Sequence, residues 1–140
     1  MDIREKLISQ LSRDEGIRLR PYRDSVGKLT IGIGRNLDDV GISQDEATVL
    51  LGNDIEKASA ALRTQLPWTV NLDDARTGVL VNMTFNMGIT TMLKFKDTLA
   101  HIQAGDYSAA ADSMLQSQWA RQVGARAQRL AEQMRTGQWQ

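Results

Sequence analysis

The spacing of apolar residues changes at Gly16, and this change restricts the folds open to the chain. Apolar residues recur at helical spacing through residues 2–14, which predicts an amphipathic helix with Glu15 at or just beyond its last turn. Beyond Gly16, Pro21 excludes a helix interior, and β-branched and aromatic residues surround a glycine suited to a hairpin turn. We therefore predict a small antiparallel sheet over residues 17–35.

Helical patterns occupy the rest of the chain. Ser43 and Glu46 have the spacing of a capping box, and the apolar stripe that follows predicts one long helix over 44–64, closed by Pro67. After Leu72, glycines separate several further helical segments.

This order of elements indicates an α+β chain, because strands and helices are segregated along it. With 140 residues we expect one domain, 1–140, built from two lobes at about 1–64 and 65–140. The N-terminal lobe carries the sheet, a long helix connects the lobes, and the C-terminal lobe is all helical. A groove between them would suit a polymer.

Composition excludes several classes of protein. There is no cysteine and a single histidine, His101, so a disulfide framework, a thiolate site and a histidine-built metal site are not expected. We predict no cofactor. No nucleophile elbow, phosphate-binding loop or complete dinucleotide fingerprint is present. We assign the methionines and the three tryptophans, Trp68, Trp119 and Trp139, to the core.

Charge is unevenly distributed although the net charge is zero. Residues 13–35 carry six basic and three acidic side chains. Residues 36–74 carry two basic and eight acidic side chains, and residues 118–140 carry four basic and one acidic. The zero balance gives no support to nucleic-acid binding. The two basic segments could face an anionic polymer or be ordinary solvated faces.

Membrane insertion is not expected. The N-terminus has no apolar region typical of a signal peptide, and no apolar run reaches the length of a spanning helix. The amphipathic, arginine-rich segment 118–140 leaves open a weaker association with membranes.

Glu15, Asp24 and Thr30 form a candidate hydrolytic site. Glycoside hydrolysis needs a protonated general acid, whose pKa burial raises, and an ionised carboxylate that activates water or attacks the sugar. A glutamate at a helix end and an aspartate on a neighbouring hairpin meet this requirement, and Thr30 lies across the turn from Asp24. Alternatively, the glutamate pairs with Arg18 or Arg126, and the aspartate bonds turn amides at Ser25 or Gly27.

The stretch from Glu15 to Gly34 resembles the phage-type lysozymes, the endolysin family of muramidases. It fits the pattern E-G-x-x-L-x-x-Y-x-D-x-x-G-x-x-T-I-G-x-G without a gap. Similar segments cover nearly the whole chain: Q-D-E-A in the long helix, N-M-T-F-N-M-G at 82–88, the segment beginning K-F-K-D-T-L, the Trp119 segment and the terminal R-T-G-Q-W.

The resemblance implies a lysozyme-like two-lobe fold and hydrolysis of the β-1,4 bond between N-acetylmuramic acid and N-acetylglucosamine. Glu15 would be the general acid, and Asp24 with Thr30 would position or activate water, with inversion at the anomeric carbon. Phe85, Thr98 and, less directly, Asn86 are implied as sugar contacts.

Two positions depart from the family pattern. Arg35 stands where many members have histidine, so any pH sensitivity due to that histidine should be missing. Asn36 stands where an apolar cleft residue is common.

A phage or prophage endolysin would be a monomer that acts on peptidoglycan. It would remain in the host cytoplasm until a membrane pore releases it to the periplasm and wall. The alternatives are a lytic transglycosylase acting on the same bond and a non-catalytic peptidoglycan-binding phage protein.

Overall fold

The computed structural model describes residues 2–140 and divides into two compact units. The N-terminal unit ends at Leu50, and the C-terminal unit is Leu51–Gln140. The division falls within one continuous helix, α2 (Gln44–Gln65).

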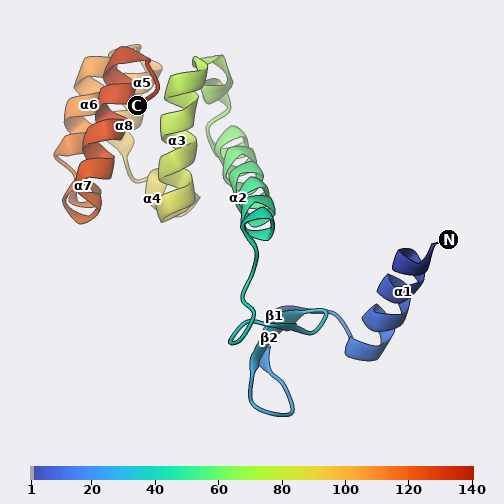
Figure 1. The fold of residues 1–140 in the computed structure, drawn as a ribbon. Helices are drawn as coiled ribbons and strands as arrows, with labels where there is room; N and C mark the ends of the chain where they lie inside the picture. Colours follow the sequence, from blue (N-terminus) through green and yellow to red (C-terminus); the bar gives the residue numbers. More distant parts are fainter. Residues whose placement is uncertain (1) are drawn as a thin grey trace. The chain divides into compact units, whose positions relative to one another are not determined.

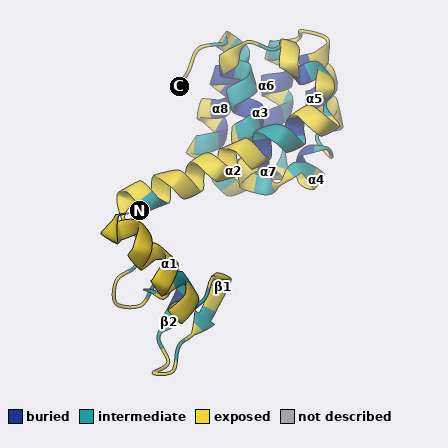
Figure 2. Cartoon of the chain, turned by 90° about the vertical axis from the view of Figure 1, so that its right-hand side faces the viewer, coloured by how far each residue is buried: buried dark blue, intermediate teal, exposed yellow. Residues whose placement is uncertain are grey.

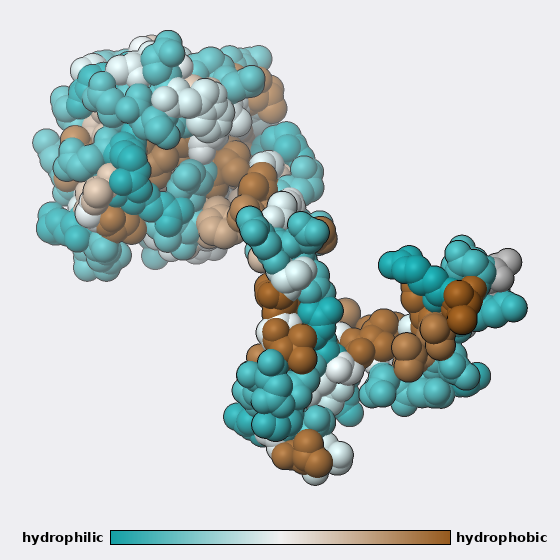
Figure 3. Space-filling view, viewed as in Figure 1, coloured by the Kyte–Doolittle hydropathy of each residue, from teal (hydrophilic) through white to brown (hydrophobic). Residues whose placement is uncertain are grey.

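Helix α1 (Ile3–Glu15) opens the N-terminal unit and confirms the predicted first helix. Asp2 is its N-cap and forms a reciprocal capping box with Glu5, which satisfies backbone N–H groups that a helix start leaves unpaired. The helix ends because Gly16 takes a φ of 74°, which favours glycine. The apolar side chains of α1 are exposed (Figures 2 and 3).

A three-stranded antiparallel sheet follows, as predicted. Its strands are β1 (Arg18–Arg23), β2 (Leu29–Gly32) and β3 (Arg35–Asn36), in the order β1-β2-β3. Tyr22 pairs with Thr30, and the β1–β2 register is irregular between Arg18 and Tyr22. Pro21 lies in this interval, where its missing N–H is tolerated.

Helix α2 matches the predicted long helix closely. Ser43 and Glu46 form the expected capping box, with the Ser43 hydroxyl accepting from the Glu46 amide at 3.1 Å. Gly52 lies within the helix and does not interrupt it, and the helix ends two residues before Pro67.

The C-terminal unit is all helical, as predicted. After the C-terminal part of α2 it contains η1 (Pro67–Asn71), α3 (Asp74–Met87), α4 (Ile89–Met92), α5 (Lys96–Gln103), α6 (Tyr107–Leu115), α7 (Gln118–Val123) and α8 (Ala125–Thr136). Helix α8 packs against α3, α6 and α7 (Figure 1). Helices α6 and α7 are separate, and Ser117 between them caps the start of α7.

The hydrophobic core of this unit confirms the assignment to the interior for four of the six methionines. Met83, Met92, Met114 and Met134 are fully buried, and Leu62 of α2 is part of the same core. Met87 is only partly buried against this core, and Met1 lies outside the described residues.

The three tryptophans differ. Trp119 is buried and meets Phe95 edge to face, with ring centroids 6.2 Å apart, while Trp68 is partly buried against the core. The assignment of Trp139 to the core is wrong, since it is 67% exposed. The chain leaves α8 at Gly137, and the Trp139 ring lies against Gly78 of α3 in a pocket that residues of α8 also line.

Arg76 ties α3 to the end of α8. Its guanidinium donates to the carbonyls of Met134 at 2.7 Å and Arg135 at 3.1 Å, which are among the carbonyls that a helix end leaves unpaired. It also stacks 3.7 Å from the ring centroid of Tyr107 and bonds Asp73. The side chain is 16% exposed, so solvent screens these contacts little.

We predict that Arg76→Met lowers the free energy of unfolding by about 2–4 kcal/mol, because two carbonyls lose a charged donor and an aromatic contact is lost. Urea denaturation measures this. The control is Arg63→Met, whose exposed pair with Glu56 should contribute less than about 1 kcal/mol. Equal effects of the two changes would contradict the assigned role.

Candidate active site

Glu15 is the last residue of α1 and borders a small pocket in the N-terminal unit. The pocket is lined by Ile8, Leu11, Ser12, Glu15, Ile33 and Gly34. The carboxylate lies against the backbone of Gly34, where an added Cβ would be 3.1 Å from Glu15 Oε2. Gly34 also has a φ of 72°, so both space and backbone conformation favour glycine there.

The burial expected of a general acid is not found within this unit, where Glu15 is exposed. Its apolar neighbours come from α1 itself and from the turn at Ile33. No pairing with Arg18 is present; the Arg18 guanidinium lies 4.6 Å from the ring centroid of Tyr22 instead. Arg126, the other partner considered, donates to Asn82 Oδ1 within the C-terminal unit at 2.7 and 3.1 Å.

Asp24 closes the hairpin between β1 and β2. Its Oδ1 accepts the amides of Val26 at 3.0 Å and Lys28 at 2.8 Å, while its own amide donates to the Lys28 carbonyl at 2.9 Å. Asp24 is therefore the turn residue that the alternative interpretation described, although its side chain bonds different amides. Within residues 2–140, both side-chain bonds use one oxygen, and Oδ2 has no protein donor.

Thr30 lies beside Asp24 on the paired strand. It is buried, and its hydroxyl donates to the Lys28 carbonyl at 2.8 Å. The same carbonyl accepts the Asp24 amide, so one peptide group connects both residues. Because the Thr30 hydroxyl already donates its proton to this carbonyl, it can act only as an acceptor toward a further hydrogen-bond donor.

Arg35 and Glu46 form the shortest ion pair among the described residues of the unit. Arg35 Nη1 lies 2.6 Å from Glu46 Oε1 and donates to the Gly41 carbonyl at 3.2 Å. The hydrogen bond from Arg35, supported by the Ser43 amide, lowers the pKa of Glu46 to about 2. The same contact raises the pKa of Arg35.

Asn36 uses its side chain for the turn after β3. Its Oδ1 accepts the Asp39 amide at 2.9 Å, and its Nδ2 donates to Asp39 Oδ2 at 3.1 Å. A polar residue at this position therefore has a local structural role.

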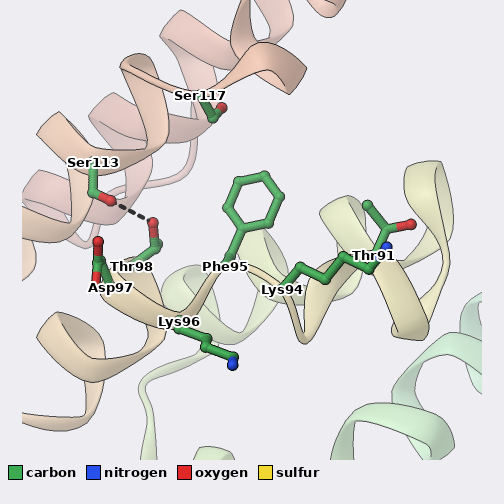
Figure 4. Close-up of a pocket in the computed structure, with 8 residues that line it drawn as sticks. All are labelled: Thr91, Lys94, Phe95, Lys96, Asp97, Thr98, Ser113 and Ser117. Carbon is green, nitrogen blue, oxygen red and sulfur yellow. Dashed lines mark hydrogen bonds between the residues drawn. The ribbon is translucent and has the colours of Figure 1, made fainter.

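The sugar contacts expected in the C-terminal unit line two separate grooves. Phe85 is 45% exposed and lies with Asp54, Lys57 and Ile89 along one groove. Thr98 lies in another (Figure 4). The side chain of Asn86 contacts the core, because its Oδ1 accepts the indole N–H of Trp119 at 2.8 Å.

Ser113 lines the same pocket as Thr98 and was not singled out by the sequence analysis. Its hydroxyl lies 2.8 Å from that of Thr98, and both face a pocket bordered by Lys94, Lys96 and Ser117 (Figure 4). The available signal was the spacing of Ser113 and Ser117, two serines four positions apart. Without the packing of α5 against α6, this signal had no partner.

Comparison with known proteins defines the class of this protein. A profile of the phage lysozyme family matches residues 12–136, and the chain belongs to that family. It is an α+β glycoside hydrolase of the lysozyme class.

Related proteins align with most of the chain. An endolysin of Acyrthosiphon pisum secondary endosymbiont phage 1 is 34% identical over 132 residues, covering 90% of this chain and 86% of the relative. The endolysin of Salmonella phage P22 is 31% identical, with 82% of each chain covered. A probable T4-type lysozyme of Dictyostelium discoideum is 29% identical, covering 91% of this chain and 92% of the relative.

No helix among residues 2–140 is both long enough and apolar enough to cross a bilayer.

The Arg35–Glu46 contact predicts a specific pH dependence of stability. Glu46 has a folded pKa of about 2 against an ordinary value of 4.5, so its contribution is complete above pH 4.5 and is lost as the pH falls through 2. The stability difference between the wild type and Glu46→Gln should therefore shrink with acidification. Urea unfolding between pH 2 and 6 measures it. A difference that stays constant over this range would contradict the shift.

Proposed function

We propose that this chain is an endolysin that hydrolyses the β-1,4 bond between N-acetylmuramic acid and N-acetylglucosamine in peptidoglycan. The observation that carries the proposal is the hairpin geometry: Asp24 and Thr30 meet at the Lys28 carbonyl, and Asp24 Oδ2 is free of protein donors within residues 2–140. That free oxygen can accept a proton from water. Membership of the phage lysozyme family supports the same activity.

The proposed reaction divides the chemistry between Glu15 and Asp24. Glu15 gives its proton to the glycosidic oxygen as the bond to C1 breaks. Asp24 Oδ2 accepts one proton from a water molecule whose oxygen attacks C1. The second hydrogen stays on that oxygen as the hydroxyl of the product, and the oxygen of Thr30 accepts a hydrogen bond from it. Attack from the face opposite the leaving group inverts the anomeric carbon, which requires the two carboxyl groups to lie about 6.5–9.5 Å apart.

The surroundings of Glu15 at the end of α1 support its role as the general acid. Apolar side chains of Ile8, Leu11 and Ile33 border it on one side. Covering of the other side by bound glycan would complete the desolvation that favours the protonated form.

Glycan binding by the C-terminal unit is part of the proposal. We assign Phe85 to stacking against a sugar face, because a half-exposed aromatic ring beside polar groups suits that contact. Thr98 and Ser113 would bond the substituents of the glycan, and Asn86 would contribute through its remaining amide group. We propose that the two lobes form one catalytic domain acting as a monomer, and that a membrane pore gives the enzyme access to the wall.

Substitution of the two carboxylates tests the mechanism. Glu15→Gln and Asp24→Asn should each lower kcat by at least about 100-fold, because one removes the proton donor and the other the proton acceptor. The control is Asp14→Asn, a neighbouring carboxylate paired with Arg13 on the surface. Clearing of chloroform-treated Gram-negative cells measures activity.

The reaction products separate hydrolysis from transglycosylation. Hydrolysis adds the mass of water to the muropeptides, whereas a lytic transglycosylase forms an anhydro sugar and can dispense with Asp24. Full activity of Asp24→Asn with anhydro products would identify the transglycosylase. Binding to walls without clearing would identify a non-catalytic binder.

Ser113 gives a test of the binding surface. Ser113→Ala should raise KM about 3- to 10-fold with little change in kcat, because one hydrogen bond to the glycan is lost. The control is Ser108→Ala, whose hydroxyl makes a long 3.4 Å contact with Arg135. Steady-state kinetics on purified peptidoglycan measures both. An unchanged KM for Ser113→Ala would remove this residue from the site.

A further inference from the structure

The turn beneath Glu15 has little to hold it in place by itself. It joins β2 to β3, a strand of two residues, and contains Gly34 directly after Ile33. Both Gly32 and Gly34 have positive φ values, 71° and 72°. Glycine adopts many conformations at little cost, so a turn with two of them needs an external contact to fix it.

Arg35, which directly follows Gly34, supplies such a contact. Its Nη1 reaches Glu46 Oε1 at 2.6 Å and the Gly41 carbonyl at 3.2 Å. Glu46 Oε1 is itself held by the Ser43 amide at 2.8 Å. The turn is therefore tied to the first turn of α2, which is a rigid element with a complete capping box.

The surroundings direct the guanidinium to this one carboxylate. Arg35 lies in a groove lined mainly by apolar side chains, among them Ile17, Ile31 and Val49. Asp45 is the other acidic residue that lines the groove, and its side chain makes no ion pair within residues 2–140. Arginine keeps its charge at any pH in which the protein works, so the contact does not titrate near neutrality.

We propose that Arg35 is a positioning residue that, through its pair with Glu46, fixes the Gly34 turn and so holds the carboxylate of Glu15 in place. The proposal rests on the proposed function, in which Glu15 is the general acid. The path is short: Glu46 holds Arg35, Arg35 holds its neighbour Gly34, and Gly34 lies against Glu15 Oε2. Displacement of a reacting group by about 1 Å can lower a rate 100-fold, so a loose turn should affect catalysis more than binding.

Kinetics on the full chain tests this role. Arg35→Met and Glu46→Gln should each lower kcat about 10- to 100-fold and leave KM within about twofold. The double variant should be no slower than the slower single variant, because both changes break one contact. Arg35→Lys should restore kcat to within about fivefold of the wild type, since an ammonium can also donate to both acceptors.

Ser43→Ala is the matched control. It removes the hydroxyl that caps the Glu46 amide at the same helix end, but leaves the Arg35 contact intact. It should lower stability while kcat stays within about twofold. A similar loss of kcat in Ser43→Ala and Arg35→Met would overturn the proposal, because the effect would then follow from weakening of α2.

Amide hydrogen exchange at Ile33, Gly34 and Arg35 gives a readout that does not depend on activity. Exchange should accelerate at least tenfold in Arg35→Met and Glu46→Gln, and stay near wild type in Ser43→Ala and Arg35→Lys. Unchanged exchange in Arg35→Met would overturn the proposal whatever the kinetics. An inactive wild type with accelerated exchange in that variant would instead reject the muramidase function and retain the anchored turn.

Discussion

The bond between Asp24 Oδ1 and the Lys28 amide is the constraint on which the hairpin site depends. One carboxylate oxygen closes the turn, and the carbonyl of the same residue, Lys28, accepts both the Asp24 amide and the Thr30 hydroxyl. The residues that close the turn, Asp24 and Lys28, are therefore also the residues that position the proposed water site. A carboxylate with two oxygens can serve both, because the structural bonds use one oxygen only.

The two units stabilise their elements by different means. The C-terminal unit has a continuous buried core, to which Arg76 adds bonds to the end of α8. The N-terminal unit has a short sheet and an exposed α1, so local polar contacts have a larger part there. The Arg35–Glu46 pair is the shortest of its ion pairs. A unit held in this way suits a site whose carboxylates need defined positions and access to solvent.

Several features were predictable because their causes are local. Helix ends follow from Asp2, Gly16 and the Ser43–Glu46 box, whose effects act within a few residues. Contacts between distant segments were not predictable. Trp139 was assigned to the core from its apolar character, but its place beyond Gly137 leaves it exposed. Ser113 was missed because its partner Thr98 lies on another helix.

The sequence alone determined the order of helices and strands, the spacing of Glu15, Asp24 and Thr30, and the family resemblance, because periodicity, capping and motif spacing are properties of neighbouring residues. Tertiary structure decided which oxygen of Asp24 is free, which side chain Arg35 binds, and that Asn86 holds Trp119. Those outcomes depend on the distances and directions between elements, which the spacing of residues along a chain does not specify.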